Sequence, residues 1–115
     1  MSALADYDAD MVTYWLGAGG DPRWDESRLL PAALAGERLA VYRTVPAGVG
    51  DAIRPGDYVT VSRAYALHHA ECNLGGWLGC ATVLLVGSAH PDELEPASGP
   101  VEFFYRPRGA GRARP

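Results

Sequence analysis

The stretch from Leu39 to Tyr65 constrains the fold of this chain more than any other segment. It reads LAVYRTVPAGVGDAIRPGDYVTVSRAY. The β-branched and aromatic runs at 39–45 and 57–62 are typical of strands, and the Pro/Gly-rich residues between them are typical of a turn. Ser62 then offers a side-chain oxygen that can cap the start of a helix. With 14 Gly and 9 Pro in 115 residues, the sequence favours short strands and many turns over a helical bundle.

Apolar periodicity predicts the remaining elements. A helix is expected over residues 3–16 with Ser2 as its N-cap, because Leu4, Met11 and Trp15 recur at helical spacing. A loop is expected over residues 23–36, with a short helical turn near 25–30 and an Ala-rich turn after it.

In the second half, the helix after Ser62 is expected over residues 63–72. The apolar run 80–88 is expected to form a central strand, residues 90–96 a loop, and residues 101–105 the last strand.

These elements define one α+β domain with a mostly antiparallel sheet. We expect an N-terminal helical segment (1–38), a core (39–106) and an Arg/Gly/Pro tail (107–115). The length suits a single domain with its own hydrophobic core.

Charge and composition exclude several classes of protein. The net charge is −4 and the ten basic residues are all Arg, so a general affinity for nucleic acid is disfavoured and a Schiff-base lysine is excluded. No apolar run approaches the ~20 residues that span a bilayer, and the N-terminus lacks the pattern of a secretory signal. We therefore expect a cytoplasmic protein without membrane association.

The two cysteines, Cys72 and Cys80, do not have the spacing of zinc ligands or of a disulfide framework. His68 and His69 lie nearby, but the four residues do not form a recognised metal motif. We expect free thiols in a reducing compartment and no bound metal.

Three positions carry possible chemistry. Arg43 interrupts an apolar strand, and its guanidinium needs a partner or a cleft that holds an anion such as a pyrophosphate. Thr60 and Ser62 share one face of a strand. Glu102, between two apolar residues, can accept hydrogen bonds from a ribose and stabilise positive charge at its anomeric carbon. Each also has a plain structural explanation: an outward-facing Arg, a helix cap and a solvent-facing Glu.

Aromatic residues near these positions can supply a flat wall for a nicotinamide or adenine ring. The candidates are Tyr58, Tyr65 and Trp77. All three are equally compatible with packing in the core.

The ordered set of motifs resembles the ADP-ribosyltransferase family, in the branch that carries an Arg, a Ser-Thr-Ser element and a Glu. The similarity lies in Tyr42-Arg43-Thr44-Val45-Pro46, in the segment from Gly56 to His69, and in Glu102-Phe103-Phe104-Tyr105. It covers about residues 39–106. The closest likeness is to small domains of phage-associated and bacterial toxin-like proteins.

This resemblance implies a compact split antiparallel sheet and a NAD-dependent activity. Arg43 would bind the NAD phosphates, Thr60 and Ser62 would occupy the first and third Ser-Thr-Ser positions, and Glu102 would be catalytic. Tyr65 or Trp77 would stack on a ring. ADP-ribose would pass to a macromolecular acceptor, in the first place a protein, or to water. Pro100 stands where arginine-modifying members carry Glu or Gln, which disfavours an arginine acceptor.

Two alternatives to the enzyme remain open. Thr60 and Val61 replace two residues of the hydroxyl motif, which also fits a non-catalytic NAD- or nucleotide-binding module of the same fold. A protein-interaction role, with the acidic helix 3–16 docked on a partner, is the other alternative.

Overall fold

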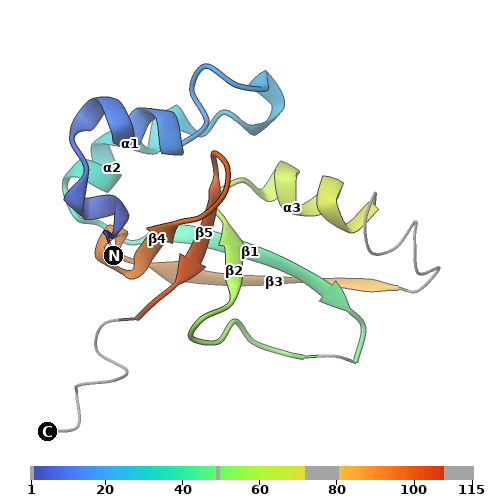
Figure 1. Ribbon diagram of the computed structural model, residues 1–115. Helices are drawn as coiled ribbons and strands as arrows, with labels where there is room; N and C mark the ends of the chain where they lie inside the picture. The colour runs from blue at the N-terminus through green and yellow to red at the C-terminus, as the bar shows by residue number, and fades with distance from the viewer. Residues whose placement is uncertain (1, 49, 72–80, 108–115) are drawn as a thin grey trace, which may run out of the picture.

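The protein is an α+β protein in which a five-stranded antiparallel sheet carries three α-helices (Figure 1). The computed structural model describes residues 2–48, 50–71 and 81–107. The strands are β1 (Leu39–Pro46), β2 (Tyr58–Thr60), β3 (Thr82–Ala89), β4 (Leu94–Pro96) and β5 (Glu102–Tyr105), in the order β3-β1-β2-β5-β4. The helices are α1 (Ala9–Trp15), α2 (Leu30–Leu34) and α3 (Arg63–His69). The expected fold class and antiparallel sheet are confirmed.

The sheet is continuous but much weaker at one junction. β1 and β3 pair along their whole length, from Leu39↔Ala89 to Pro46↔Thr82. β1 and β2 share one aligned pair, Tyr42↔Thr60. Figure 1 shows the consequence: β1 and β3 run across the view, whereas β2 and β5 run steeply, so the sheet turns at this junction.

The position of β3 differs from the expectation. The apolar run 80–88 was expected to be central, but β3 is at the end of the strand order and pairs with β1 alone among the described residues. Leu85 and Ala89 are buried, whereas Val83 is 40% exposed and Val86 64%. An uncharged β-branched run has the same appearance in an edge strand as in a central one, so composition alone misplaced it.

The N-terminal helical segment is shorter and more broken than expected. A 3-10 turn at Leu4–Asp6 precedes α1, which begins at Ala9. Asp8, and not Ser2, is the N-cap, because its side chain accepts a hydrogen bond from the Met11 amide. Two 3-10 turns, Pro22–Trp24 and Ser27–Leu29, then lead into α2.

Three further elements were missed. α2 occupies the expected Ala-rich turn. Part of the expected loop 90–96 forms the 3-10 turn Pro91–Glu93 and the strand β4. β4 pairs with β5 along Leu94↔Tyr105 to Pro96↔Phe103.

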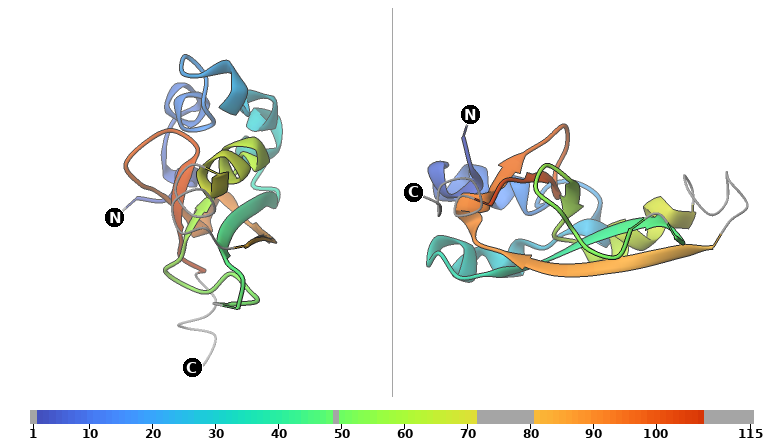
Figure 2. Two further views of the ribbon diagram at one scale, coloured as in Figure 1. Left: turned by 90° about the vertical axis from the view of Figure 1, so that its right-hand side faces the viewer. Right: turned by 90° about the horizontal axis from the view of Figure 1, so that it is seen from below.

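The hydrophobic core joins the N-terminal segment to strands β4 and β5 of the sheet. Leu4, Leu16, Leu94 and Phe103 are fully buried in one cluster, and the ring of Trp15 lies against that of Phe103. Figure 2 shows α1 and α2 at one end of the molecule and α3 along the sheet. The N-terminal segment is therefore part of the domain.

Gly17 ends α1 in a conformation that a side chain would strain. Its φ is +99°, and a Cβ there would lie 2.8 Å from the carbonyl oxygen of Trp24. Glycine therefore lets the following loop pass close to the helix end.

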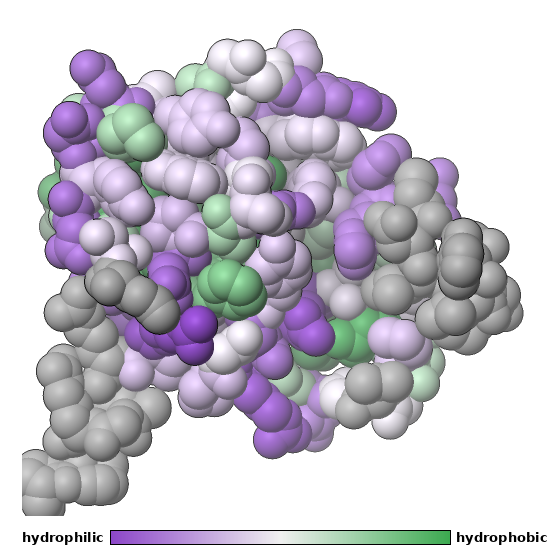
Figure 3. Space-filling view, in the orientation of Figure 1, coloured by the Kyte–Doolittle hydropathy of each residue, from purple (hydrophilic) through white to green (hydrophobic). Residues whose placement is uncertain are grey.

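The face in Figure 3 is mostly hydrophilic or intermediate in hydropathy, with hydrophobic residues in small separate groups. Within the described ranges, no helix combines the length and apolar character needed to cross a bilayer.

Candidate functional site

Strand register brings distant polar residues to one face of the sheet. Tyr42 of β1 is opposite Thr60 of β2, which is opposite Glu102 of β5. Directly paired residues point to the same side of a sheet. Helix α3 covers part of this face, where the Thr44 hydroxyl donates a hydrogen bond to the Ala66 carbonyl oxygen, 3.2 Å away.

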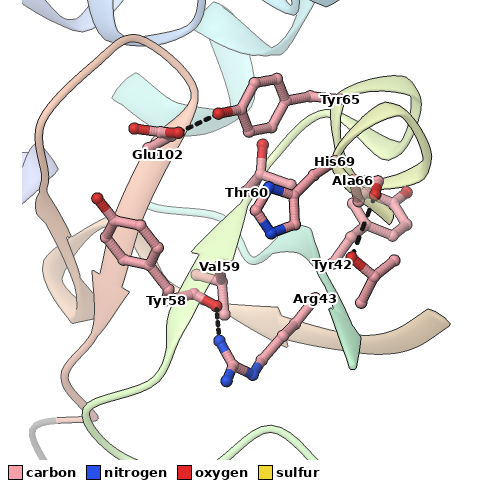
Figure 4. A pocket seen from close by; sticks show the side chains of 10 residues that line it. Tyr42, Arg43, Tyr58, Val59, Thr60, Tyr65, Ala66, His69 and Glu102 are labelled. Carbon is pink, nitrogen blue, oxygen red and sulfur yellow. Dashed lines mark hydrogen bonds between the residues drawn. The ribbon is translucent and has the colours of Figure 1, made fainter. Parts of the chain in front are cut away.

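A small hollow opens between this face and α3 (Figure 4). Its walls are residues 42–44 of β1, residues 58–60 of β2, Tyr65, Ala66 and His69 of α3, and Glu102 of β5. Its volume is about 60 Å³, which is room for roughly two water molecules. Arg43, Thr60, Tyr65 and Glu102, all predicted site residues, line it.

Arg43 lies between Tyr42 and Thr44 on β1, so its side chain leaves the strand on the opposite face from Thr60 and Glu102. Figure 4 shows its guanidinium turned toward the backbone of Tyr58, at the far side of the small hollow from Glu102. The Arg43 guanidinium donates to the Tyr58 carbonyl oxygen at 3.0 Å, and its Nε lies 3.7 Å from the Asp57 carboxylate. These contacts tie β1 to the start of β2. The side chain keeps 32% of its surface exposed, and a guanidinium has five N–H donors, so donors remain for a ligand.

Glu102 accepts hydrogen bonds at both carboxylate oxygens. The Tyr65 hydroxyl donates to Oε2, and the Ser98 hydroxyl donates to Oε1 at 3.1 Å. The Ser98 oxygen is also 2.9 Å from the Tyr58 hydroxyl. Two hydroxyls therefore hold this carboxylate, and a third, from Tyr58, contacts one of those two.

Tyr65 meets the site through its hydroxyl. Burial is the main reason that the pKa of Tyr65 lies above its ordinary value, and the hydrogen bond to Glu102 and the charge of Glu102 raise it further. The Tyr65 ring meets the indole of Trp24 edge-on, with 5.5 Å between centroids. The predicted role of Tyr65 in ring stacking stays a prediction.

Thr60 and Ser62 use their hydroxyls within the fold. The Thr60 Oγ1 accepts from the Ser62 amide at 3.1 Å, and the Ser62 Oγ accepts from the Tyr65 amide at 3.1 Å. Ser62 is fully buried and lines neither hollow of the site, because its side chain caps α3. Thr60 reaches the wall of the small hollow.

A large hollow of about 360 Å³ lies on the other side of the Tyr65–Glu102 contact. Gly17, Gly20, Asp21 and Trp24 of the N-terminal segment form one wall, residues 99–102 form another, and Tyr65 completes it. The two hollows share Tyr65 and Glu102. A hydrogen bond from Arg23 lowers the pKa of Asp21 to about 2, so this wall carries a carboxylate paired with Arg23.

The backbone just before Glu102 is strained. Val101 has a φ of +60°, a conformation that is costly for a β-branched residue. Its amide donates to the Trp15 carbonyl oxygen at 2.9 Å, and its own carbonyl oxygen accepts from the Val61 amide at 3.3 Å. Its side chain is buried. The surrounding structure thus holds a strained residue beside the carboxylate, a feature that clusters at functional sites.

A further hollow, of about 470 Å³, lies between residues 51–53 and strand β3. Among the described residues of its wall, Asp51 is the one ionisable side chain apart from Tyr105, and none of the described predicted site residues reaches it. It therefore offers no comparable chemistry.

Trp77, Cys72 and Cys80 lie outside the described residues. Within the described residues, no group of three or more His, Cys, Asp or Glu side chains is arranged to hold a metal ion.

The structure adds two residues that the sequence did not single out, Ser98 and Trp24, and it puts His69, considered from the sequence beside the two cysteines, in the wall of the small hollow. His69 ends the segment that carries the family resemblance, and its ring lies between Tyr65 and Arg43 (Figure 4). Its spacing of four residues from Tyr65 on a predicted helix was a usable signal. A serine in a Pro/Gly turn and a tryptophan in a loop carry no such signal.

Comparison of the chain with protein-family models, curated proteins and solved structures found no match.

Proposed function

We propose that this protein binds NAD and cleaves its nicotinamide–ribose bond, passing ADP-ribose to a macromolecular acceptor or to water. One observation carries the proposal. Glu102 is placed where the two hollows meet, and Arg43 lines the same small hollow at its far end. Glu102 would meet the ribose of a dinucleotide, and the guanidinium of Arg43, reached past the start of β2, would meet its pyrophosphate.

In this proposal Glu102 carries the chemistry. Its carboxylate accepts a hydrogen bond from a hydroxyl of the nicotinamide ribose and stabilises the oxocarbenium-like charge that develops at the anomeric carbon. The carbon–nitrogen bond breaks, and its electron pair neutralises the nicotinamide ring, which leaves. The acceptor nucleophile then bonds to the anomeric carbon and loses its proton to solvent.

Arg43 fixes the phosphates at the opposite end of the hollow. Its rigid fork of N–H groups matches phosphate oxygens better than an ammonium does. The contacts with Tyr58 and Asp57 orient the guanidinium before a ligand arrives. Thr60 contributes to the wall between the two ends, and Ser62 contributes indirectly, by capping the helix that bears Tyr65.

Ligand binding requires the two hollows to join. A volume of about 60 Å³ is far below the 300–1,000 Å³ of ordinary ligand sites, whereas the large hollow alone reaches about 360 Å³. Tyr65 and Glu102 are the residues that both hollows share. In the bound state a ribose hydroxyl replaces the Tyr65 hydroxyl at Glu102, and the hollows become one groove.

The test is Glu102→Gln, which keeps the size of the side chain and removes its charge. We expect nicotinamide release to fall by about 100-fold or more, with an unchanged thermal unfolding midpoint. The matched control is Glu37→Gln, which makes the same charge change at an exposed position away from both hollows. The measurement is nicotinamide release from NAD, with label transfer to lysate proteins followed in parallel. Full turnover in Glu102→Gln would remove the proposal.

The internal use of the Thr60 and Ser62 hydroxyls favours a second candidate. With these hydroxyls bound to the backbone, the same groove would serve a NAD- or nucleotide-binding module without catalysis. Titration calorimetry separates the two: heat of NAD binding without nicotinamide release supports the binding module.

A further inference from the structure

The turn at residues 97–101, which precedes β5, makes hydrogen bonds to the backbone of Glu102. The Ala97 amide donates to the Glu102 carbonyl oxygen at 3.0 Å, and the Glu102 amide donates to that of Gly99 at 3.2 Å. The strained Val101 lies inside this turn. The turn therefore fixes the backbone of Glu102 through both its amide and its carbonyl group.

Within the turn, the Ser98 hydroxyl meets Oε1 of the Glu102 carboxylate at 3.1 Å. A Cβ at Gly99 would lie 3.4 Å from the same oxygen, so glycine leaves its flank open. Ser98 lines neither hollow, unlike Glu102, which lines both. The serine thus reaches the carboxylate without occupying the space that a ligand needs.

The Ser98 hydroxyl is itself held from strand β2. Its oxygen lies 2.9 Å from the hydroxyl of Tyr58, whose residue pairs with Phe104 of β5. The Tyr58 ring packs against that of Phe104, with 5.0 Å between centroids. The orientation of Ser98 is therefore set by a strand adjacent to the one that carries Glu102.

The two hydroxyls on Glu102 are not equivalent. Tyr65 lies between the hollows and contacts Oε2, so a ligand that spans both hollows displaces it. Ser98, outside them, contacts Oε1 and stays in place. The Thr60 oxygen, at the first Ser-Thr-Ser position of the resemblance, accepts from the Ser62 amide.

We propose that Ser98 is a positioning residue, which holds the Glu102 carboxylate in its working orientation when ligand displaces Tyr65. The inference rests on the proposed function for its catalytic consequence, but the positioning itself can be read without NAD.

The first measurement is the carboxyl ¹³C resonance of Glu102, assigned by its absence in Glu102→Gln. Ser98→Ala shifts this resonance, because a hydrogen-bond donor to the carboxylate is lost, and Ser98→Thr restores it. Ser88→Ala is the matched control, since Ser88 is exposed on β3 and binds Arg38 instead. An unchanged Glu102 resonance in Ser98→Ala overturns the proposal.

The second measurement is NAD cleavage. Ser98→Ala lowers kcat about fivefold, the effect of losing one hydrogen bond to a charged group at an exposed site, and leaves KM within about twofold. Ser98→Thr recovers most of kcat. A change in KM with full kcat overturns the positioning role.

The two failures are distinguishable. If the unmodified protein releases no nicotinamide, the proposed function fails, and the Glu102 resonance alone decides whether Ser98 positions the carboxylate. Ser98 is exposed, so Ser98→Ala leaves no buried group unsatisfied and is expected to fold.

Discussion

Two segments with similar hydroxyl-bearing side chains use them in opposite ways. In the strand-to-helix corner, residues 60–65, the oxygens of Thr60 and Ser62 accept from backbone amides. In the turn at residues 97–102, the Ser98 hydroxyl donates to the carboxylate of Glu102. The corner therefore stabilises the fold, whereas the turn contacts the carboxylate that we propose to be catalytic. A hydroxyl near a candidate site does not reveal by its type alone which of these tasks it has.

The largest expected effect is a loss of stability on substitution of Ser62 in the strand-to-helix corner. Ser62→Ala removes the cap of α3 and leaves the Tyr65 amide without its partner. We expect a loss of about 1–2 kcal/mol in the free energy of unfolding and an unchanged affinity of the folded protein for NAD. Denaturant unfolding and calorimetry measure the two quantities. Weaker NAD binding at full folding would show that the corner also serves the ligand.

A second prediction concerns the strain in the turn. Where φ is negative, a protein is normally more stable with Ala than with Gly at that position. Val101, however, has a φ of +60°. Both Val101→Gly and Val101→Ala lose the buried side chain, so their difference reports the backbone. We expect Val101→Gly to be the more stable of the two by about 1 kcal/mol. The reverse order in urea unfolding would mean that the turn is unstrained.

The smallest effect is the pH dependence that Tyr65 gives to stability. Because burial and Glu102 raise the pKa of Tyr65 in the folded protein, the unfolded chain loses this proton first as pH rises. The stabilisation is fully present below the unfolded value near pH 10 and declines above it. Tyr65→Phe should flatten this decline above pH 10 in denaturant unfolding, with Tyr14→Phe, at an exposed tyrosine, as the control. An equal decline in Tyr65→Phe would contradict the folded-state shift.

The sequence predicted most of the sheet, because the local signals were strong. β1, β2 and β5 lie where β-branched runs and Pro/Gly turns put them, and α3 follows Ser62 as expected. The position of β3 and the existence of β4 were not predictable in the same way. Edge or central placement depends on pairing across the whole chain, and Leu94-Glu95-Pro96 is too short and polar for a strand signal.

The site was also predictable where local sequence signals were strong. Arg43, Thr60 and Glu102 were found from their unusual place in apolar strands, and register brings Thr60 opposite Glu102. Ser62 also stood out, but a residue at a strand-to-helix corner is an obvious candidate both for capping and for ligand contact. Ser98 could not be found, because its role depends on a turn whose shape comes from a strained Val101 and contacts with Trp15 and Val61.

The single aligned pair between Tyr42 and Thr60 has a mechanical consequence. The junction between β1 and β2 is the weakest in the sheet. Separating β1 from β2 disrupts one aligned residue pair, whereas separating β1 from β3 disrupts eight. Local opening follows the path with the fewest interactions to lose. We therefore expect local opening of the sheet to begin along this junction, which borders the small hollow.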